Sequence, residues 1–426
     1  MNLGTSLKDN NLAELSSGKG YKKSMSNIRK SFFILLSLML GLTWQFNAYA
    51  QELDYADKSG KAAEIIKNSK QYQAFLALQK KIAEKNGDRV RKFRIVVDGV
   101  NGKEFYREFN EITKKESYYP YIEMKNNKSI ELLKDFLYLN FDGTIKYINL
   151  SPKYKTELNR VIGFFKNKKE LLGFSSSPSF GNDFHYEKLD FTSFRNIKYL
   201  HLNDVDIEKL YLPKVSDLES IRLYSTNTKR IINLDKSESL KNFEVKGLIL
   251  NDFSLLEKSK KLKQLDILNS KDSTLKIPNL FNYKKLQYLS IISKSIEPFI
   301  GISDLLELKF LYVNSNYKFN DIRFPNKIEE IYLSGIENIK IPNLKNNKKL
   351  RELGITRTKI KKIEGLDSLN YLETLNLVSN DIEEISGLNN LINLKVLNLS
   401  GNKIKRVEGL SMLKNVEKIN LKYNKI

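Results

Sequence analysis

The second half of the chain repeats one arrangement of apolar and polar positions. One copy begins Leu372-x-x-Leu375-x-Leu377 and continues x-x-Asn380-x-Ile382, and the next copy starts 22 residues later. The alternating part predicts a short strand with two leucines on one face, because successive side chains of a strand point to opposite faces. The asparagine suits a tight turn, and the later apolar positions predict a returning segment. Each copy therefore predicts one coil of the chain.

The period extends over the whole second half. From the first copy onward the spacings are 21, 22, 22, 24, 22, 20, 22, 22, 22 and 22 residues, which a merely leucine-rich composition would not produce. One coil cannot cover its own apolar edge, so neighbouring coils must stack and share a core. We therefore predict a curved α/β solenoid over residues 191–426, with short parallel strands on its concave face. Its 11 units, the last one partial, start at Ile197, Leu218, Leu240, Leu262, Leu286, Leu308, Ile328, Leu350, Leu372, Leu394 and Val416.

This pattern resembles the 22-residue class of leucine-rich repeat found in bacterial internalins and in a regulatory subunit of a protein phosphatase. The resemblance covers about residues 190–426 and is specific for architecture, whereas it says little about function. It implies a binding protein that holds a partner on the concave face of its solenoid.

Asparagine occupies the turn position in only some copies. We interpret these side chains as structural, because their amides can bond backbone groups of adjacent coils. Other residue types take the position elsewhere, and prolines enter some returning segments, so the middle repeats should be less regular than the last four. The asparagines are Asn316, Asn380, Asn402 and Asn424.

Residues 51–190 lack the repeat, and we predict that they form a small α+β domain. Such a domain would also shield the first coil, since the ends of a solenoid need covering. The Asp-Gly pair at Asp142 is a strong hairpin signal. The expected elements are a helix at Lys61–Lys85, a hairpin-like stretch at 91–109, a hairpin at 136–150, a second helix at Tyr154–Leu172 and a loop at Ser175–Asp183.

The first 50 residues read as a secretory signal. Basic residues follow Met25, an apolar run extends from Phe32 to Leu42, and Ala48-Tyr49-Ala50 precedes Gln51. This order matches the signal for cleavage, whereas a membrane-spanning helix needs about 20 apolar residues. Met25 is an alternative start of the chain. We expect a secreted, periplasmic or cell-surface protein that begins at Gln51.

Composition narrows the chemistry further. The chain has no cysteine, which removes disulfides, thiolate metal sites and cysteine catalysis, and its two histidines, His185 and His201, leave no multi-histidine metal site. We expect no cofactor and no bound metal. The formal charge of +22 can attract anionic surfaces, but the lysines are scattered and no nucleic-acid motif accompanies them. Nucleic acid is therefore not an expected partner.

The candidate binding residues are strand positions that lie between the buried leucines. They come from repeats far apart in sequence, yet the solenoid should place them on one concave surface. Exposed aromatic rings are enriched in interfaces, although rings that only pack on one another would explain the same pattern. The last repeats place polar residues such as Thr374 and Asn398 there instead. The candidates are Tyr199, His201, Arg222, Tyr224, Tyr288, Phe310, Tyr312 and Tyr332.

Three functions fit these observations. The first is an exported protein that binds a protein partner through the concave face. The second is adhesion to an anionic glycan or lipid through the basic surface, which moderate salt would abolish. The third is an enzyme within residues 51–190, where acids such as Glu104 and Glu108 are plentiful, but most such acids are solvated surface groups. The sequence favours binding over catalysis.

The sequence stops at Ile426, two strand positions into a repeat. An uncovered last coil exposes apolar surface and a free strand edge. This leaves two expectations open: self-association through the last repeat, or a truncated reading frame.

Overall fold

The computed structural model describes the repeats and part of the preceding segment. The chain divides into two compact units, and nearly all described residues lie in the second unit, Ser69–Val96 with Met124–Ile426. The predicted signal sequence and, apart from residues 94–97, the hairpin-like stretch predicted at 91–109 lie outside the described residues. The residues that the structure describes are 64, 67–88, 94–97, 136–139 and 144–426, apart from 153–154, 167, 177–183, 215–216, 225–227, 249–251, 270–273, 299, 317–322 and 337–339.

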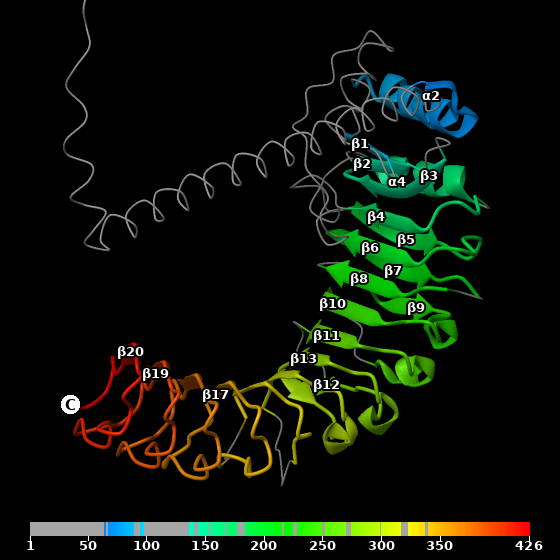
Figure 1. The fold of residues 1–426 in the computed structure, drawn as a ribbon. Helices are drawn as coiled ribbons and strands as arrows, with labels where there is room; N and C mark the ends of the chain where they lie inside the picture. The colour runs from blue at the N-terminus through cyan, green and yellow to red at the C-terminus, as the bar shows by residue number, and fades with distance from the viewer. Residues whose placement is uncertain are drawn as a thin grey trace, which may run out of the picture. The chain divides into compact units, whose positions relative to one another are not determined.

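The second unit is built on one 15-stranded sheet, in which eleven neighbouring parallel strands come from the predicted copies of the repeat, one strand from each copy. These strands lie along the inner side of the curved stack of coils (Figure 1). The predicted solenoid is therefore confirmed, with little helix in its described part. The eleven strands are β6 (Tyr199–Asn203), β8 (Ser220–Tyr224), β10 (Asn242–Leu248), β11 (Gln264–Asn269), β13 (Tyr288–Ile292), β15 (Phe310–Asn314), β16 (Glu330–Ser334), β17 (Glu352–Thr356), β18 (Thr374–Asn376), β19 (Val396–Asn398) and β20 (Lys418–Asn420).

The core lies directly behind this sheet. Leu375 is in register with Leu397, and Leu397 with Ile419, so equivalent side chains stack from coil to coil. Leu375 and Leu397 are fully buried, as are most of the other apolar repeat positions. Each buried aliphatic side chain contributes roughly 1.5–3 kcal/mol, which offsets the entropy lost when the coils become ordered.

The returning segments form the outer side of the stack. Three of the early coils pair there as a second parallel sheet of β5 (Phe184–Asp190), β7 (Val205–Tyr211) and β9 (Arg230–Ile232). Four consecutive coils, beginning with the one that contains β9, use short 3-10 turns, and one further pair of strands joins two of these coils. The turns are η2 (Leu234–Lys236), η3 (Ser254–Lys258), η4 (Leu280–Asn282) and η5 (Ile302–Asp304), and the strands are β12 (Thr274–Leu275) and β14 (Ser295–Ile296).

A ladder of asparagine side chains joins the last coils, as predicted. The Asn402 amide donates to the carbonyl oxygens of Leu377 and Leu399, each at 2.9 Å, and its oxygen accepts from the Ile382 amide at 3.1 Å. Asn380 and Asn424 make equivalent bonds one coil before and one coil after. Asn316 differs because its side chain is exposed, so the structural interpretation was wrong at that position.

The segment before residue 190 continues the same sheet. Strands β2 (Phe136–Leu139) and β3 (Ile145–Leu150) form the predicted antiparallel hairpin. Strand β3 then pairs in parallel with β4 (Gly173–Ser176), and β4 pairs with β6 of the first repeat. The start of the expected loop at Ser175 is therefore strand. The sheet runs across residue 190 without a break, while a domain boundary there stays a prediction.

Two helices accompany this hairpin, close to the predicted positions. Helix α2 (Lys70–Lys85) begins at an N-cap, Ser69, whose hydroxyl accepts a bond from the Tyr72 amide, so the expected helix at Lys61–Lys85 is interrupted there. Helix α4 (Lys155–Phe165) ends earlier than expected. A short strand, β1 (Arg94–Val97), lies at the end of the long sheet.

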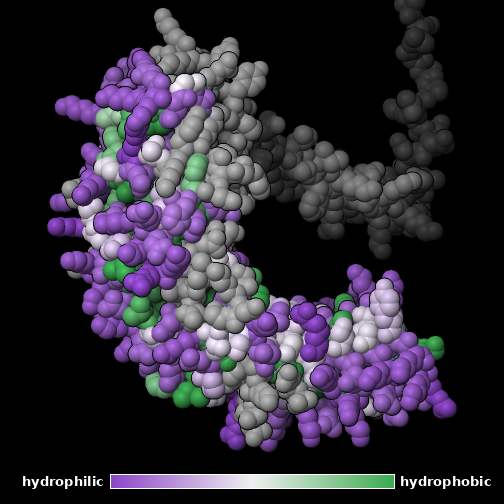
Figure 2. Space-filling model, turned by 180° about the vertical axis from the view of Figure 1, so that it is seen from behind, coloured by the Kyte–Doolittle hydropathy of each residue, from purple (hydrophilic) through white to green (hydrophobic). Residues whose placement is uncertain are grey.

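Within the described residues, no helix combines the length and the apolar character that crossing a bilayer requires. The flank seen in Figure 2 is largely hydrophilic over the C-terminal coils, and its hydrophobic residues are scattered.

Candidate partner-binding face

The outward side chains of the repeat strands form three rows. The first and third residues of each strand make two rows, and the fifth residues of the longer strands make the third. Register places Tyr199, Tyr288 and Phe310 in the first row. Tyr312 pairs with Tyr332 in the second row, which also contains His201 and Arg222. Tyr224 lies in the third row. The eight candidate residues therefore share one face, but they do not form one cluster.

Four of them form a continuous group of rings on β13, β15 and β16, which we call the aromatic patch. Tyr288 and Phe310 stack with their ring centroids 4.3 Å apart and their planes within 2° of parallel. Tyr332 lies 5.7 Å from Phe310 and meets Tyr312 edge-on at 6.3 Å. All four residues remain partly exposed. The rings thus support one another and still offer surface to a partner.

The other four candidates lie on β6 and β8, separated from the aromatic patch by β10 and β11. Tyr199 contacts the ring of Tyr147 at 5.8 Å. His201 is buried, and its Nε2 lies 3.1 Å from the Ser220 hydroxyl oxygen. Burial lowers the pKa of His201 to about 4, so its imidazole is neutral at ordinary pH. His201 therefore offers little to a partner.

Arg222 and Tyr224 are engaged by a carboxylate that the sequence analysis did not select. Arg222 Nε donates to Glu244 at 2.7 Å, and the Tyr224 hydroxyl donates to the other oxygen of Glu244. One strand further on, Lys246 reaches Asp266 at 3.1 Å and also lies 4.8 Å from the centre of the Tyr224 ring. An ammonium group over an aromatic face contributes about 0.5–1 kcal/mol at exposed sites. This end of the face is therefore neutralised by its own cations.

Glutamates border the other end of the aromatic patch. Glu330 and Glu352 follow Phe310 in the first row and face each other across β16 and β17. The Tyr332 hydroxyl donates to Glu352. Tyr332 lies over Gly354, where an added Cβ would come within 2.7 Å of the ring, so only glycine leaves room for it. Burial and the nearby carboxylates of Glu352 and Glu329 raise the pKa of Glu330.

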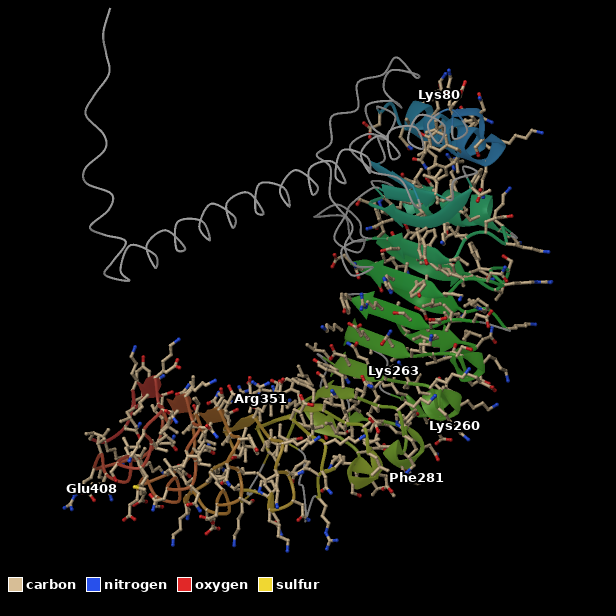
Figure 3. The ribbon with its side chains drawn as sticks, viewed as in Figure 1. Lys80, Lys260, Lys263, Phe281, Arg351 and Glu408 are labelled. Atoms are coloured by element: carbon tan, nitrogen blue, oxygen red, sulfur yellow. The ribbon has the colours of Figure 1, made fainter. Side chains whose placement is uncertain are left out.

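This glutamate pair lines a shallow depression of about 200 Å³ together with seven other residues. It lies at the inner sheet, where Figure 3 labels Arg351, whereas Phe281 and Glu408 lie on the outer side. Five of its nine lining residues are glutamates and two are basic. The lining residues are Glu329, Glu330, Arg351, Glu352, Glu373, Thr374, Lys395, Val396 and Glu417.

Charged residues immediately precede most of the strands along one edge of the sheet, and we call them the edge ladder. Their charges alternate from Lys198 to Lys241 and again from Lys309 to Glu417. Glu373 is bound on both sides, by Arg351 at 2.6 Å and by Lys395 at 2.7 Å. Near the other end, Glu219 lies between Lys198 at 3.5 Å and Lys241 at 2.7 Å. Hydrogen bonds from Lys395 and Arg351 lower the pKa of Glu373. Most basic groups of the ladder are thus already paired.

The comparisons with known proteins agree with this architecture. Residues 372–411 and 392–426 match the family described as "Leucine Rich repeats (2 copies)". A leucine-rich-repeat protein of Leptospira interrogans has a similar structure, with a TM-score of 0.50 and 18% identity over 67% of this chain and 80% of that one. The chain therefore contains leucine-rich repeats and has the fold of a bacterial leucine-rich-repeat protein.

Two internalins of Listeria monocytogenes are also similar. Internalin C2 is 22% identical, with a TM-score of 0.32 over 44% of this chain and 74% of that one. A second internalin is 16% identical, with a TM-score of 0.34 over 67% of this chain and 72% of that one. No curated protein matches the sequence.

Proposed function

We propose that this chain is a binding protein that holds a protein partner on the concave face of its solenoid. The observation that carries the proposal is the aromatic patch, in which four rings from three adjacent strands remain partly exposed. Rings that are held rigidly by their neighbours bury a large area at a small cost in entropy, which is why interfaces concentrate them. The fold contributes the geometry, since it brings distant repeats onto one surface.

Removing two rings of the patch tests this function. We expect the double variant Phe310→Ala and Tyr312→Ala to fold but to lose its partner, because truncating a central aromatic residue commonly weakens an interface by about 2 kcal/mol. Two such losses correspond to about a thousandfold in affinity when they add. The measurement compares the proteins captured from culture medium and envelope extract by the immobilised wild type and by the variant.

A matched control is available on the rest of the surface. Phe281 and Tyr371 are exposed to 41% and 66%, and Phe281 lies on the outer side (Figure 3). The variant Phe281→Ala with Tyr371→Ala removes the same two ring types and should capture the same partner as the wild type. If the Phe310 and Tyr312 variant captured the partner as well as the wild type does, the concave face would not be the binding surface.

We further propose that the protein acts outside the cytoplasm. The support is the order of basic residues, apolar run and Ala48-Tyr49-Ala50 at the N-terminus. Protein recovered from the periplasm, the cell surface or the medium should begin at Gln51, as N-terminal sequencing would show. Recovery of the chain only from the cytoplasm, with residues 25–50 intact, would contradict export.

A further inference from the structure

The concave face carries two pairs of carboxylates, one on each side of the aromatic patch. Glu244 and Asp266 pair across β10 and β11, in the same row as Tyr312 and Tyr332. Glu330 and Glu352 pair across β16 and β17, in the row of Phe310. These four carboxylates lie on the concave face of a chain whose formal charge is +22.

The first pair is satisfied from within the chain. Glu244 binds Arg222, and Asp266 binds Lys246, at distances of 2.7 and 3.1 Å. Lys246 at the same time lies over the Tyr224 ring. One lysine thus occupies a site made of an aromatic face and a carboxylate, and it shows which chemical group such a site accepts.

The second pair also combines carboxylates with a neighbouring aromatic ring, that of Tyr332. Glu330 and Glu352 take part in none of the ion pairs formed among the described residues. Arg351 lines the same depression and interacts electrostatically with both glutamates, but its ion pair, at 2.6 Å, is with Glu373. Like charges directly opposite one another on neighbouring strands repel, so this arrangement lowers the stability of the solenoid. An opposite charge supplied from outside would remove the repulsion.

We propose that the partner presents a lysine- or arginine-rich extended segment, and that one of its cationic side chains binds between the aromatic patch and the Glu330–Glu352 pair. This inference rests on the proposed function and specifies its partner. The site combines a ring face with carboxylates, as around Lys246, and its two glutamates are among the five that line the depression. The rest of this basic chain repels a cationic segment, whereas the Glu330–Glu352 pair attracts it to one place.

The test uses fluorescein-labelled hexa-arginine and hexa-citrulline, whose side chains have nearly the same shape but differ in charge. Fluorescence anisotropy should show that the full chain binds hexa-arginine at least about tenfold more tightly, because charge-assisted hydrogen bonds are lost with citrulline. The double variant Glu330→Gln with Glu352→Gln should bind hexa-arginine about tenfold more weakly than the wild type. Its thermal midpoint should not fall, because the substitution removes like-charge repulsion.

A second double variant separates the local site from net charge. Glu384 is exposed, and so is Glu408, which lies on the outer side (Figure 3), so Glu384→Gln with Glu408→Gln makes the same change in net charge elsewhere. This control should bind hexa-arginine within about twofold of the wild type, since exposed charges at a distance are screened by salt. Equal losses in the two variants, equal binding of the two peptides, or preferential binding of hexa-glutamate would each overturn the proposal.

Different results would contradict the proposed concave-face interface and the proposed cation site. If the Phe310 and Tyr312 variant loses its captured partner while hexa-arginine and hexa-citrulline bind alike, the concave face is the interface and the cationic segment is wrong. If hexa-arginine depends on Glu330 and Glu352 while the ring variant captures its partner normally, the cation site is present and the proposed interface is wrong.

Discussion

Replacing Asn380 with alanine should lower the free energy of unfolding by about 3–5 kcal/mol. The buried amide donates to the carbonyl oxygens of Ile355 and Leu377 at 2.8 and 3.0 Å. Its oxygen accepts from the backbone amides of Thr358 and Ile360 at 3.1 and 3.2 Å. Alanine leaves these buried groups unpaired, and each costs about 1–3 kcal/mol unless water or local relaxation satisfies it. Urea denaturation measures the change in stability.

The exposed asparagine at the equivalent turn of an earlier coil is the control. Asn316→Ala should change stability by no more than about 0.5 kcal/mol, as is usual for surface substitutions. Hydrogen exchange adds a local readout, since the amides of Thr358 and Ile360 should lose protection only in the Asn380 variant. Equal destabilisation by the two substitutions would show that the turn position acts through backbone conformation and not through the buried amide.

Replacing Gly387 with alanine should destabilise the solenoid by about 2–5 kcal/mol. Gly387 has a φ of +67°, and an added Cβ would lie 2.5 Å from the backbone carbonyl oxygen of Ile363 in the preceding coil. Left-handed backbone costs an alanine roughly 1–2 kcal/mol. The overlap adds about 1–3 kcal/mol, because a backbone atom can move only if the coils separate. The thermal or urea midpoint of the variant gives the size of the effect.

Gly365 occupies the same repeat position one coil earlier and separates these two causes. Its φ is +76°, but nothing lies within 4 Å of an added Cβ. Gly365→Ala should therefore show only the conformational cost, about 1–2 kcal/mol. If the two alanine variants were equally stable, close packing between the coils would not be the reason for glycine at Gly387.

The sequence was sufficient to predict the solenoid because nearly every contact that defines it recurs at a fixed separation. Leu375 pairs with Leu397, which lies one period away, so the spacing of the leucines predicts which residues of neighbouring strands pair. The upstream coils were not found because their period differs. Tyr147 pairs with Gly173 and Gly173 with Tyr199, each 26 residues apart, and the short strand β4 carries only one large apolar residue, Phe174. No leucine pattern identifies such a coil.

The candidate site was only partly predictable, for a related reason. Strand alternation predicts that Tyr312 and Tyr332 lie at outward positions with Phe310 beside them, and in the structure the Tyr332 ring packs against the other two. The glutamates beside them were missed because the chain has 50 acidic residues, and only strand register shows that Glu330 and Glu352 face each other. His201 lies at an outward position too, yet it is buried, which alternation alone does not reveal.

The edge ladder affects which gains and losses of whole repeats the solenoid tolerates. Arg351, Glu373 and Lys395 alternate in charge from coil to coil, and each is one 22-residue repeat from the next. Deleting the single coil that contains Glu373 would bring Arg351 against Lys395, whereas deleting two coils would restore opposite neighbours. Exposed ion pairs are individually weak, at about 0–1 kcal/mol, so a single deletion removes two such pairs and adds one repulsive contact at the new junction. Duplication and loss of repeats here are therefore better tolerated in even numbers.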